Sequence, residues 1–127
     1  MPKSATKVLI VDDDEAIAEA LRIILTIEGF AVATAAQEAA AYRQIIAEQP
    51  DLIIMDIFLA GEDGRELARS LKTVSATKDI PIIMISAHPL SFESLQETGA
   101  DEFLPKPFEV ADLMNSIHRC VPGLSRP

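Results

Sequence analysis

Short apolar runs alternate with helical patterns along this chain of 127 residues, and this alternation restricts the possible folds more than any other feature. Each run is long enough for a buried strand, and each helical pattern is long enough to connect two strands. Strands that alternate with helices pair in parallel through right-handed crossovers, with helices on both faces of the sheet. The sequence therefore predicts a doubly wound α/β fold. The expected strands are Val8–Val11, Ala31–Thr34, Leu52–Met55, Ile80–Ile85 and Glu102–Leu104.

Apolar spacing and helix-ending residues place the helices between these strands. In the first helix Ile17, Leu21 and Leu25 recur at helical spacing, and Glu28-Gly29 ends it. No internal repeat or interdomain linker is evident, so we expect one domain over residues 1–127, with a core of about 7–121 and a tail or linker stub at 122–127. The other expected helices are Ala39–Ala47, a segment after Asp63-Gly64 marked by Leu67, Leu71 and Val74, the weakly anchored Leu90–Thr98, and a last helix marked by Val110, Met114, Ile117 and Val121.

Charge and composition exclude several classes of protein. Apolar residues make up 49% of the chain, yet no run is long enough to span a membrane. A net charge of −9 argues against nucleic acid or an anionic membrane as the direct partner. The first residues lack the apolar stretch of a signal peptide, and the single cysteine, Cys120, fits a reducing compartment. We therefore expect a cytoplasmic protein, with Cys120 facing the core from the last helix.

Polar side chains follow four of the expected strands at their carboxyl ends. Asp12 and Asp13 follow the first strand, Asp56 the third, Ser86 the fourth and Lys106 the fifth. In an open parallel sheet, binding sites form beyond the carboxyl ends of the strands, where the strand order reverses. Three acids, a hydroxyl and an amine are therefore expected to meet at one edge of the sheet.

These residue types suit magnesium-dependent phosphoryl transfer. Carboxylates such as Asp12, Asp13 and Asp56 are hard oxygen ligands of the kind that Mg²⁺ prefers, and a bound cation would let a phosphorylated donor approach them. One of these carboxylates could then attack phosphorus and form an acyl phosphate. Lys106 can bind the transferred oxygen atoms through its charge, and Ser86 can bind them as a hydrogen-bond donor.

Five short motifs, in order along the chain, resemble those of the receiver domains of two-component response regulators, including the chemotaxis regulators. The resemblance covers nearly the whole chain, from residue 7 to residue 121. It implies a flavodoxin-like fold with five helices, in which the five parallel strands lie in the order 2-1-3-4-5. The motifs are Val11-Asp12-Asp13, Met55-Asp56, Ser86-Ala87, Phe103 and Lys106-Pro107-Phe108.

The resemblance also implies a function. It makes Asp56 the acceptor of a phosphoryl group from a histidine kinase or a histidine phosphotransfer protein, with Mg²⁺ bound by Asp13, Asp56 and the main-chain carbonyl of Phe58. Asp12 would act largely through a metal-bound water. A receiver domain is a signalling module rather than an enzyme, because it catalyses only its own phosphorylation and dephosphorylation. Its output then passes to a downstream protein or to an output domain in a longer protein.

A conformational switch is implied as well. In the family, the residue at the position of Ser86 moves toward the phosphoryl group, and the aromatic residue at the position of Phe103 swings inward behind it. The resemblance further implies a cis peptide bond between Lys106 and Pro107. The sequence departs from the family at Ala60, where proline is usual, so the loop at residues 57–62 has fewer fixed φ angles.

A second departure is Pro105, which is uncommon directly before the motif lysine. Proline removes a main-chain donor, but this is tolerated if the fifth strand lies at an edge of the sheet. The next acids along the first loop, Asp14 and Glu15, have a simpler explanation, because carboxylates are favoured at the start of a helix. We therefore expect Asp14 to cap the first helix.

Three alternatives stay open from the residues alone. A phosphatase of the haloacid dehalogenase type would use the Asp-x-Asp spacing in Asp12-Asp13-Asp14, but it would leave Asp56 unexplained. A flavin-binding module should have a phosphate loop rich in Ser, Thr and Gly after the first strand, and here that loop is acidic. The third alternative is a receiver-like protein-binding domain that is not phosphorylated.

Overall fold

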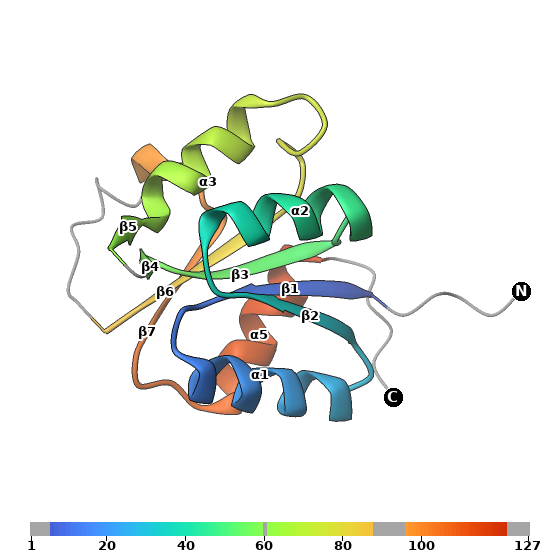
Figure 1. Cartoon of the computed structure of the whole chain (residues 1–127). Helices are drawn as coiled ribbons and strands as arrows, with labels where there is room; N and C mark the ends of the chain where they lie inside the picture. Colours follow the sequence, from blue (N-terminus) through green and yellow to red (C-terminus); the bar gives the residue numbers. More distant parts are fainter. Residues whose placement is uncertain (1–5, 60, 88–95, 122–127) are drawn as a thin grey trace, which may run out of the picture.

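A computed structural model describes residues 6–59, 61–87 and 96–121 of the chain. Its main sheet has five parallel strands in the order β2-β1-β3-β6-β7, which confirms the predicted order 2-1-3-4-5 (Figure 1). The strands lie within one residue of their expected bounds, except that β6 starts two residues late. Their bounds are β1 Lys7–Val11, β2 Ala31–Ala35, β3 Leu52–Asp56, β6 Ile82–Ser86 and β7 Glu102–Pro105.

The late start of β6 has a local cause. Pro81 has no amide hydrogen to donate to a neighbouring strand, although its carbonyl still accepts from the amide of Ile53 at 3.0 Å. The carbonyl of Ile80 is bound by the side chain of Lys72, with Nζ at 2.8 Å. Ile80 therefore belongs to the connection that enters the strand, and Ile82 is the first strand residue.

Helices cover both faces of the sheet, as the alternation predicts (Figure 1). Helix α1 and helix α5 pack on one face, and α2 and α3 pack on the other. The expected helix Leu90–Thr98 falls mostly on residues 88–95, outside the described part, and only residues 96–98 of it are described, as helix. The expected tail at 122–127 also lies outside. The bounds are α1 Glu15–Ile27, α2 Glu38–Glu48, α3 Gly64–Thr73 and α5 Val110–Cys120.

Successive residues of the central strands point to opposite faces and are buried on both. Val8 and Ile10 of β1 pack with α1 and α5, whereas Leu9 and Val11 pack with α2 and α3. The same alternation holds in β3 and β6. Because neither face meets water, these strands are continuous apolar runs, as expected for a parallel sheet covered by helices. No helix in the described ranges combines the length and the hydropathy needed to cross a bilayer.

Two apolar residues that the helical spacing assigned to the core are exposed. Val74 is 52% exposed because α3 ends at Thr73, and the hydroxyl of Thr77 then binds the carbonyl of Leu71 at 2.6 Å. Val110 is 44% exposed, although Met114 and Ile117, further along α5, are buried. Val74 directly follows α3 and Val110 is the first residue of α5, so both valines sit at a helix end, where the spacing no longer places a side chain on the core.

The structure supports three local expectations. The Lys106-Pro107 peptide bond is cis. Pro105 lies in β7, which is an edge strand of the sheet, so its missing amide leaves no gap inside the sheet. Cys120 is half-buried against the core on the α1–α5 face, and this burial raises the pKa of its thiol to about 11.

The segment after β3 contains two short strands that the sequence did not predict. Strands β4 (Phe58–Leu59) and β5 (Glu62–Asp63) pair antiparallel and form a short hairpin. Gly61 lies in the turn with φ at +87°, a conformation that glycine adopts without strain. Leu59 is fully buried among the side chains of the α2–α3 face. The hairpin therefore stands at the carboxyl edge of the sheet, directly beyond Asp56.

Candidate functional site

The sheet register brings the predicted polar residues to one edge. Val11 pairs with Met55, and Asp56 pairs with Ile85, so the ends of β1, β3 and β6 lie level with one another. Ser86 pairs with Pro105, and the amide of Lys106 donates to the carbonyl of Ser86 at 2.9 Å. Residues far apart in the sequence thus meet where the strands end, as the topology predicts.

Lys106 connects the two acidic strand ends. Its Nζ lies 2.9 Å from Asp56 Oδ2 and 3.8 Å from Asp12 Oδ2. The side chains are 19% exposed for Lys106, 14% for Asp56 and 4% for Asp12, so little water screens these charges. Asp56 is therefore the carboxylate that faces a fixed cation at short range and also remains in contact with solvent.

Asp12 is the most deeply buried acid of the site. Its Oδ1 accepts the amide of Asp14 at 2.9 Å, which fixes the orientation of the carboxylate. Burial raises the pKa of Asp12 above its usual range, and the neighbouring charges of Asp56 and Asp13 act in the same direction. The Asp14 amide and the Lys106 ammonium oppose this rise. Holding this carboxylate ionised inside the protein therefore costs stability.

Asp13 and Asp14 take different positions on the same loop. Asp13 is exposed next to the buried Asp12. Asp14 is the N-cap of α1, and its Oδ1 accepts the amides of Ala16 at 3.0 Å and Ile17 at 3.2 Å. The expectation that Asp14 caps the first helix is confirmed, which leaves Asp12 and Asp13 as the candidate site acids of this loop.

The donor set fits Mg²⁺ better than a metal that needs a closed cage. Asp12, Asp13 and Asp56 offer hard carboxylate oxygens, and the Phe58 carbonyl follows on the hairpin. In the described ranges, no three acidic, histidine or cysteine side chains are already arranged as ligands around one point. Mg²⁺ keeps several waters and is usually held by one or two carboxylates, and carboxylate oxygens are the donors available at this edge. The same set would be poor for Zn²⁺, which prefers nitrogen and sulfur ligands.

The two expected switch residues lie on adjacent strands. Ser86 is the last residue of β6 and is buried, at the carboxyl edge of the sheet. Phe103 lies on β7 opposite Met84, two residues earlier on β6 than Ser86. Its ring is half-buried against the α2–α3 face of the core. A hydroxyl and an aromatic ring are thus placed on neighbouring strands near the phosphoacceptor candidate.

Two contacts at the site were not predicted. Gly64 opens α3 and donates its amide to the carbonyl of Ile57, and a Cβ at this position would overlap the carbonyl oxygen of Asp56. Glu62 on β5 accepts the amide of Glu38 at the start of α2. The only sequence signal for the first contact is a glycine at the first helical position, where helix propensity alone would disfavour it. Nothing in the sequence signals the second contact.

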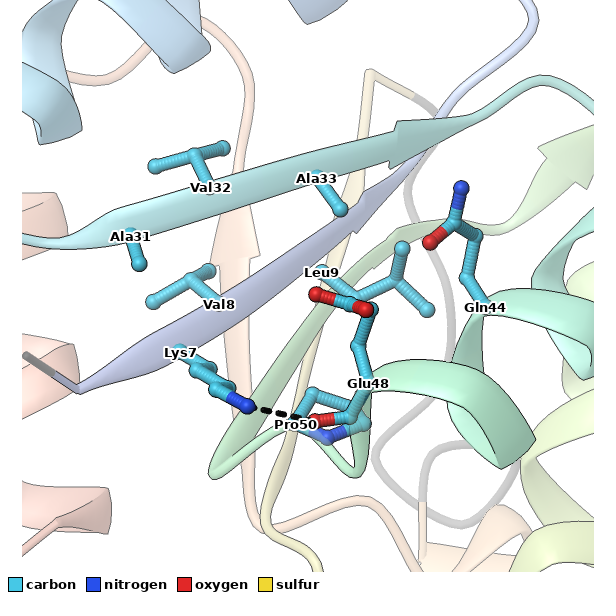
Figure 2. Close-up of a pocket in the computed structure, with 9 residues that line it drawn as sticks. All are labelled: Lys7, Val8, Leu9, Ala31, Val32, Ala33, Gln44, Glu48 and Pro50. Atoms are coloured by element: carbon cyan, nitrogen blue, oxygen red, sulfur yellow. Dashed lines mark hydrogen bonds between the residues drawn. The ribbon is translucent and has the colours of Figure 1, made fainter.

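A pocket at the opposite, amino-terminal edge of the sheet does not compete with this site. Figure 2 shows it between β1, β2 and the end of α2, with Lys7 Nζ donating to the Glu48 carbonyl at 3.2 Å. Its volume is about 80 Å³, and small apolar side chains such as Ala31 and Ala33 line much of it. This is room for a few waters, far less than most ligand pockets offer.

An Asp12→Asn variant should be more stable than the parent at neutral pH, by about 1 kcal/mol in metal-free buffer. Asparagine keeps an oxygen for the Asp14 amide and removes the buried charge. Because the pKa of Asp12 is raised on folding, the folded state binds more protons between the unfolded value, 3.8, and the raised value. The parent therefore loses stability as pH rises through that window, and the variant does not.

Urea unfolding at pH 7 and at mildly acidic pH measures this difference. The difference in the free energy of unfolding between Asp12→Asn and the parent should become smaller as pH falls toward the raised pKa of Asp12. Asp14→Asn is the matched control, because asparagine and aspartate are equally good helix caps and its stability should stay close to that of the parent. An Asp12→Asn protein that is less stable than the parent at pH 7 would contradict the conclusion that the buried charge of Asp12 costs stability.

Comparisons with known proteins identify the family. The chain is 39% identical to the phosphate regulon transcriptional regulatory protein PhoB of Pseudomonas aeruginosa, over 91% of this chain and 53% of that protein. It spans about half the length of the curated relatives that it matches first. Two of the solved structures with the same fold illustrate the likeness. Chemotaxis protein CheY4 of Vibrio cholerae has 30% identity and a TM-score of 0.86, covering 93% of this chain and all of that one.

The second is response regulator TrrA of Thermotoga maritima in complex with Mg²⁺-BeF, with 29% identity and a TM-score of 0.82, over 91% of this chain and 99% of that one. The family model described as "Response regulator receiver domain" matches residues 8–118. That span contains the acidic loop, the end of β3, the end of β6 and Lys106. The chain therefore belongs to the family of response regulator receiver domains of two-component systems.

Proposed function

We propose that Asp56 accepts a phosphoryl group from a histidine kinase or a histidine phosphotransfer protein, in a reaction that requires Mg²⁺. The observation that carries this proposal is the 2.9 Å contact between Lys106 Nζ and Asp56 Oδ2 at the carboxyl edge of the sheet. It places a fixed cation beside the partly exposed carboxylate. The same cation can bind an oxygen of a phosphoryl group attached to Asp56.

In the proposed reaction an Oδ atom of Asp56 attacks phosphorus, and the bond from phosphorus to the imidazole nitrogen of the donor breaks. The imidazole leaves with the electron pair of that bond, and the product is an acyl phosphate on Asp56. Asp13, Asp56 and the Phe58 carbonyl would hold Mg²⁺, with Asp12 acting through a bound water. The metal would neutralise negative charge on the oxygen atoms of the phosphoryl group during transfer. Lys106 and the Ser86 hydroxyl would bind the remaining oxygen atoms.

The response would pass through Ser86 and Phe103. A phosphoryl group on Asp56 offers the Ser86 hydroxyl a new acceptor, and movement of Ser86 toward it would change the space beside Phe103. The half-buried ring, which packs on the α2–α3 face of the core, could then take a more buried position. Phosphorylation would in this way favour one of two states of the surface around β7.

The partners of the domain follow from the proposed phosphoryl transfer to Asp56. We propose that residues 1–127 act as a single receiver domain with a signalling role, and that the domain catalyses only its own phosphorylation and dephosphorylation. Output would pass to a downstream protein, or to an output domain in a longer protein, since the relatives are about twice as long.

Intact mass spectrometry tests the proposal. The parent, incubated with a small-molecule phosphodonor and Mg²⁺, should gain about 80 Da, and an Asp56→Asn variant should gain nothing, because an amide is not a nucleophile for phosphorus. Chelating the metal should prevent labelling of the parent. A response regulator known to label fully serves as the positive control.

Three results would contradict the proposal. An unlabelled parent under conditions that label the control fully would indicate a receiver-like binding domain that is not phosphorylated. Steady release of phosphate from many unrelated phosphate esters would instead indicate a phosphatase of the haloacid dehalogenase type. Equal labelling of the parent and of Asp56→Asn would place the phosphoryl group on another residue.

A further inference from the structure

The start of α2 is capped by a residue from the β4–β5 hairpin. The N-cap residue Gln37 makes no side-chain hydrogen bond to the helix. The amide of Glu38 instead donates to Oε1 of Glu62 at 3.1 Å, from a residue 24 positions further along the chain. A carboxylate is favoured there because the first amides of a helix lack partners within the helix and carry its positive dipole end.

Glu62 belongs to the same hairpin as the proposed carbonyl ligand. In the hairpin Leu59 pairs with Glu62, and Phe58 pairs with Asp63. Leu59 anchors β4 in the core, and the bond from the Gly64 amide to the Ile57 carbonyl anchors the return to α3. The Glu62 bond adds a third anchor, which ties the hairpin to a different helix.

We propose that Glu62 is a positioning residue for the metal site. By capping α2 it would hold the hairpin where the main-chain carbonyl of Phe58 can serve as a ligand. This inference rests on the proposed function, which puts that carbonyl in the Mg²⁺ site. The sequence supplies no proline in the hairpin to fix a φ angle, and Gly61 lies at φ +87°. Contacts from outside the turn therefore have to set the position of the hairpin.

The cap and the metal are then coupled. Both restrain the same hairpin, so each must strengthen the other by the same factor. Loss of the Glu62 bond should lower the affinity for Mg²⁺, and Mg²⁺ should slow hydrogen exchange at the Glu38 amide. The second effect is measured at α2, away from the reacting atoms, and a purely structural role of Glu62 would not produce it.

The test compares Glu62→Asp and Glu62→Gln with the parent in Mg²⁺ titrations followed by amide NMR. Aspartate keeps the charge but is one methylene shorter, so it no longer reaches the Glu38 amide. Its Mg²⁺ affinity should fall about fivefold, the scale of a lost helix cap. Glutamine keeps the acceptor oxygen and should lose less. Mg²⁺ should slow exchange of the Glu38 amide in the parent and leave it unchanged in Glu62→Asp.

Glu15→Gln is the matched control, because it removes one exposed carboxylate at the start of α1, beside the acidic loop, without touching the hairpin. Urea unfolding confirms that each variant is fully folded during titration. If Glu62→Asp binds Mg²⁺ as tightly as the parent does, Glu62 has no effect on the metal site and the inference is wrong. If Glu15→Gln loses as much Mg²⁺ affinity as Glu62→Asp does, the loss reflects only the negative charge around the metal site, and the inference is also wrong. A parent that neither binds Mg²⁺ nor gains a phosphoryl group would contradict the proposed function instead.

Discussion

A Lys106→Met variant should accept a phosphoryl group on Asp56 about a hundredfold more slowly than the parent, at equal concentrations of Mg²⁺ and phosphodonor. Methionine has a similar length and keeps the packing of the lysine stem, but it removes the cation 2.9 Å from Asp56 Oδ2. The transferred oxygens then lose a charged partner in the transition state, where their charge is least shielded by water. The time course of the phosphoryl adduct, followed by intact mass, measures the effect.

Lys78→Met is the matched control, because Lys78 is an exposed lysine on the connection between α3 and β6. It should label at the parent rate, which would exclude a general effect of net charge. Lys106→Arg keeps the charge on a longer and planar group, so its rate should lie between those of the parent and Lys106→Met. A Lys106→Met rate within about threefold of the parent would mean that Lys106 only balances the acidic site and takes no part in transfer.

The fold could be predicted from the sequence because it depends on a repeated local pattern. Leu9 and Ile10 are adjacent in β1 and are buried in opposite clusters, which explains why a continuous apolar run, and not an alternating one, marked the strand. Five such runs with helices between them leave few topologies. The strand order itself came from the resemblance to receiver domains, and the sheet confirms it.

The location of the site was predictable for a related reason. Strand ends in a parallel sheet share an edge whatever the loop sequences are, so Asp12, Asp56, Ser86 and Lys106 had to lie at one edge once the strands were assigned. The strand order then places them on neighbouring strands. The individual contacts were not predictable in this way. That Lys106 lies closer to Asp56 than to Asp12 depends on side-chain packing that the pattern does not contain.

The remaining features depend on contacts between distant residues. The capping of α2 by Glu62 joins residues 24 apart in the sequence. The hairpin at residues 58–63 has strands of two residues each, too short for any hydrophobic period to show. Such features arise only when the sheet edge has already brought the segments together.

Among the residues whose contacts the sequence pattern does not reveal, Gly64 is the one whose replacement should lower stability most. Gly64→Ala should lower the free energy of unfolding by about 2 kcal/mol, because the added Cβ would overlap the Asp56 carbonyl oxygen and lie 2.9 Å from that of Ile57. Both obstacles are main-chain atoms, so no side-chain rotation relieves them. Helix propensity alone predicts the opposite sign, since alanine is favoured over glycine by about 1 kcal/mol inside a helix.

The same substitution should also slow labelling of Asp56 about tenfold in protein that is still folded, because the displaced main chain carries the acceptor away from Lys106. Ser70→Ala, on the exposed side of α3, is the control and should leave both stability and labelling unchanged. Urea unfolding and the adduct time course give the two readouts. A Gly64→Ala protein that is more stable than the parent would show that α3 can shift freely at its start, and the close approach to Asp56 would then not be what requires glycine there.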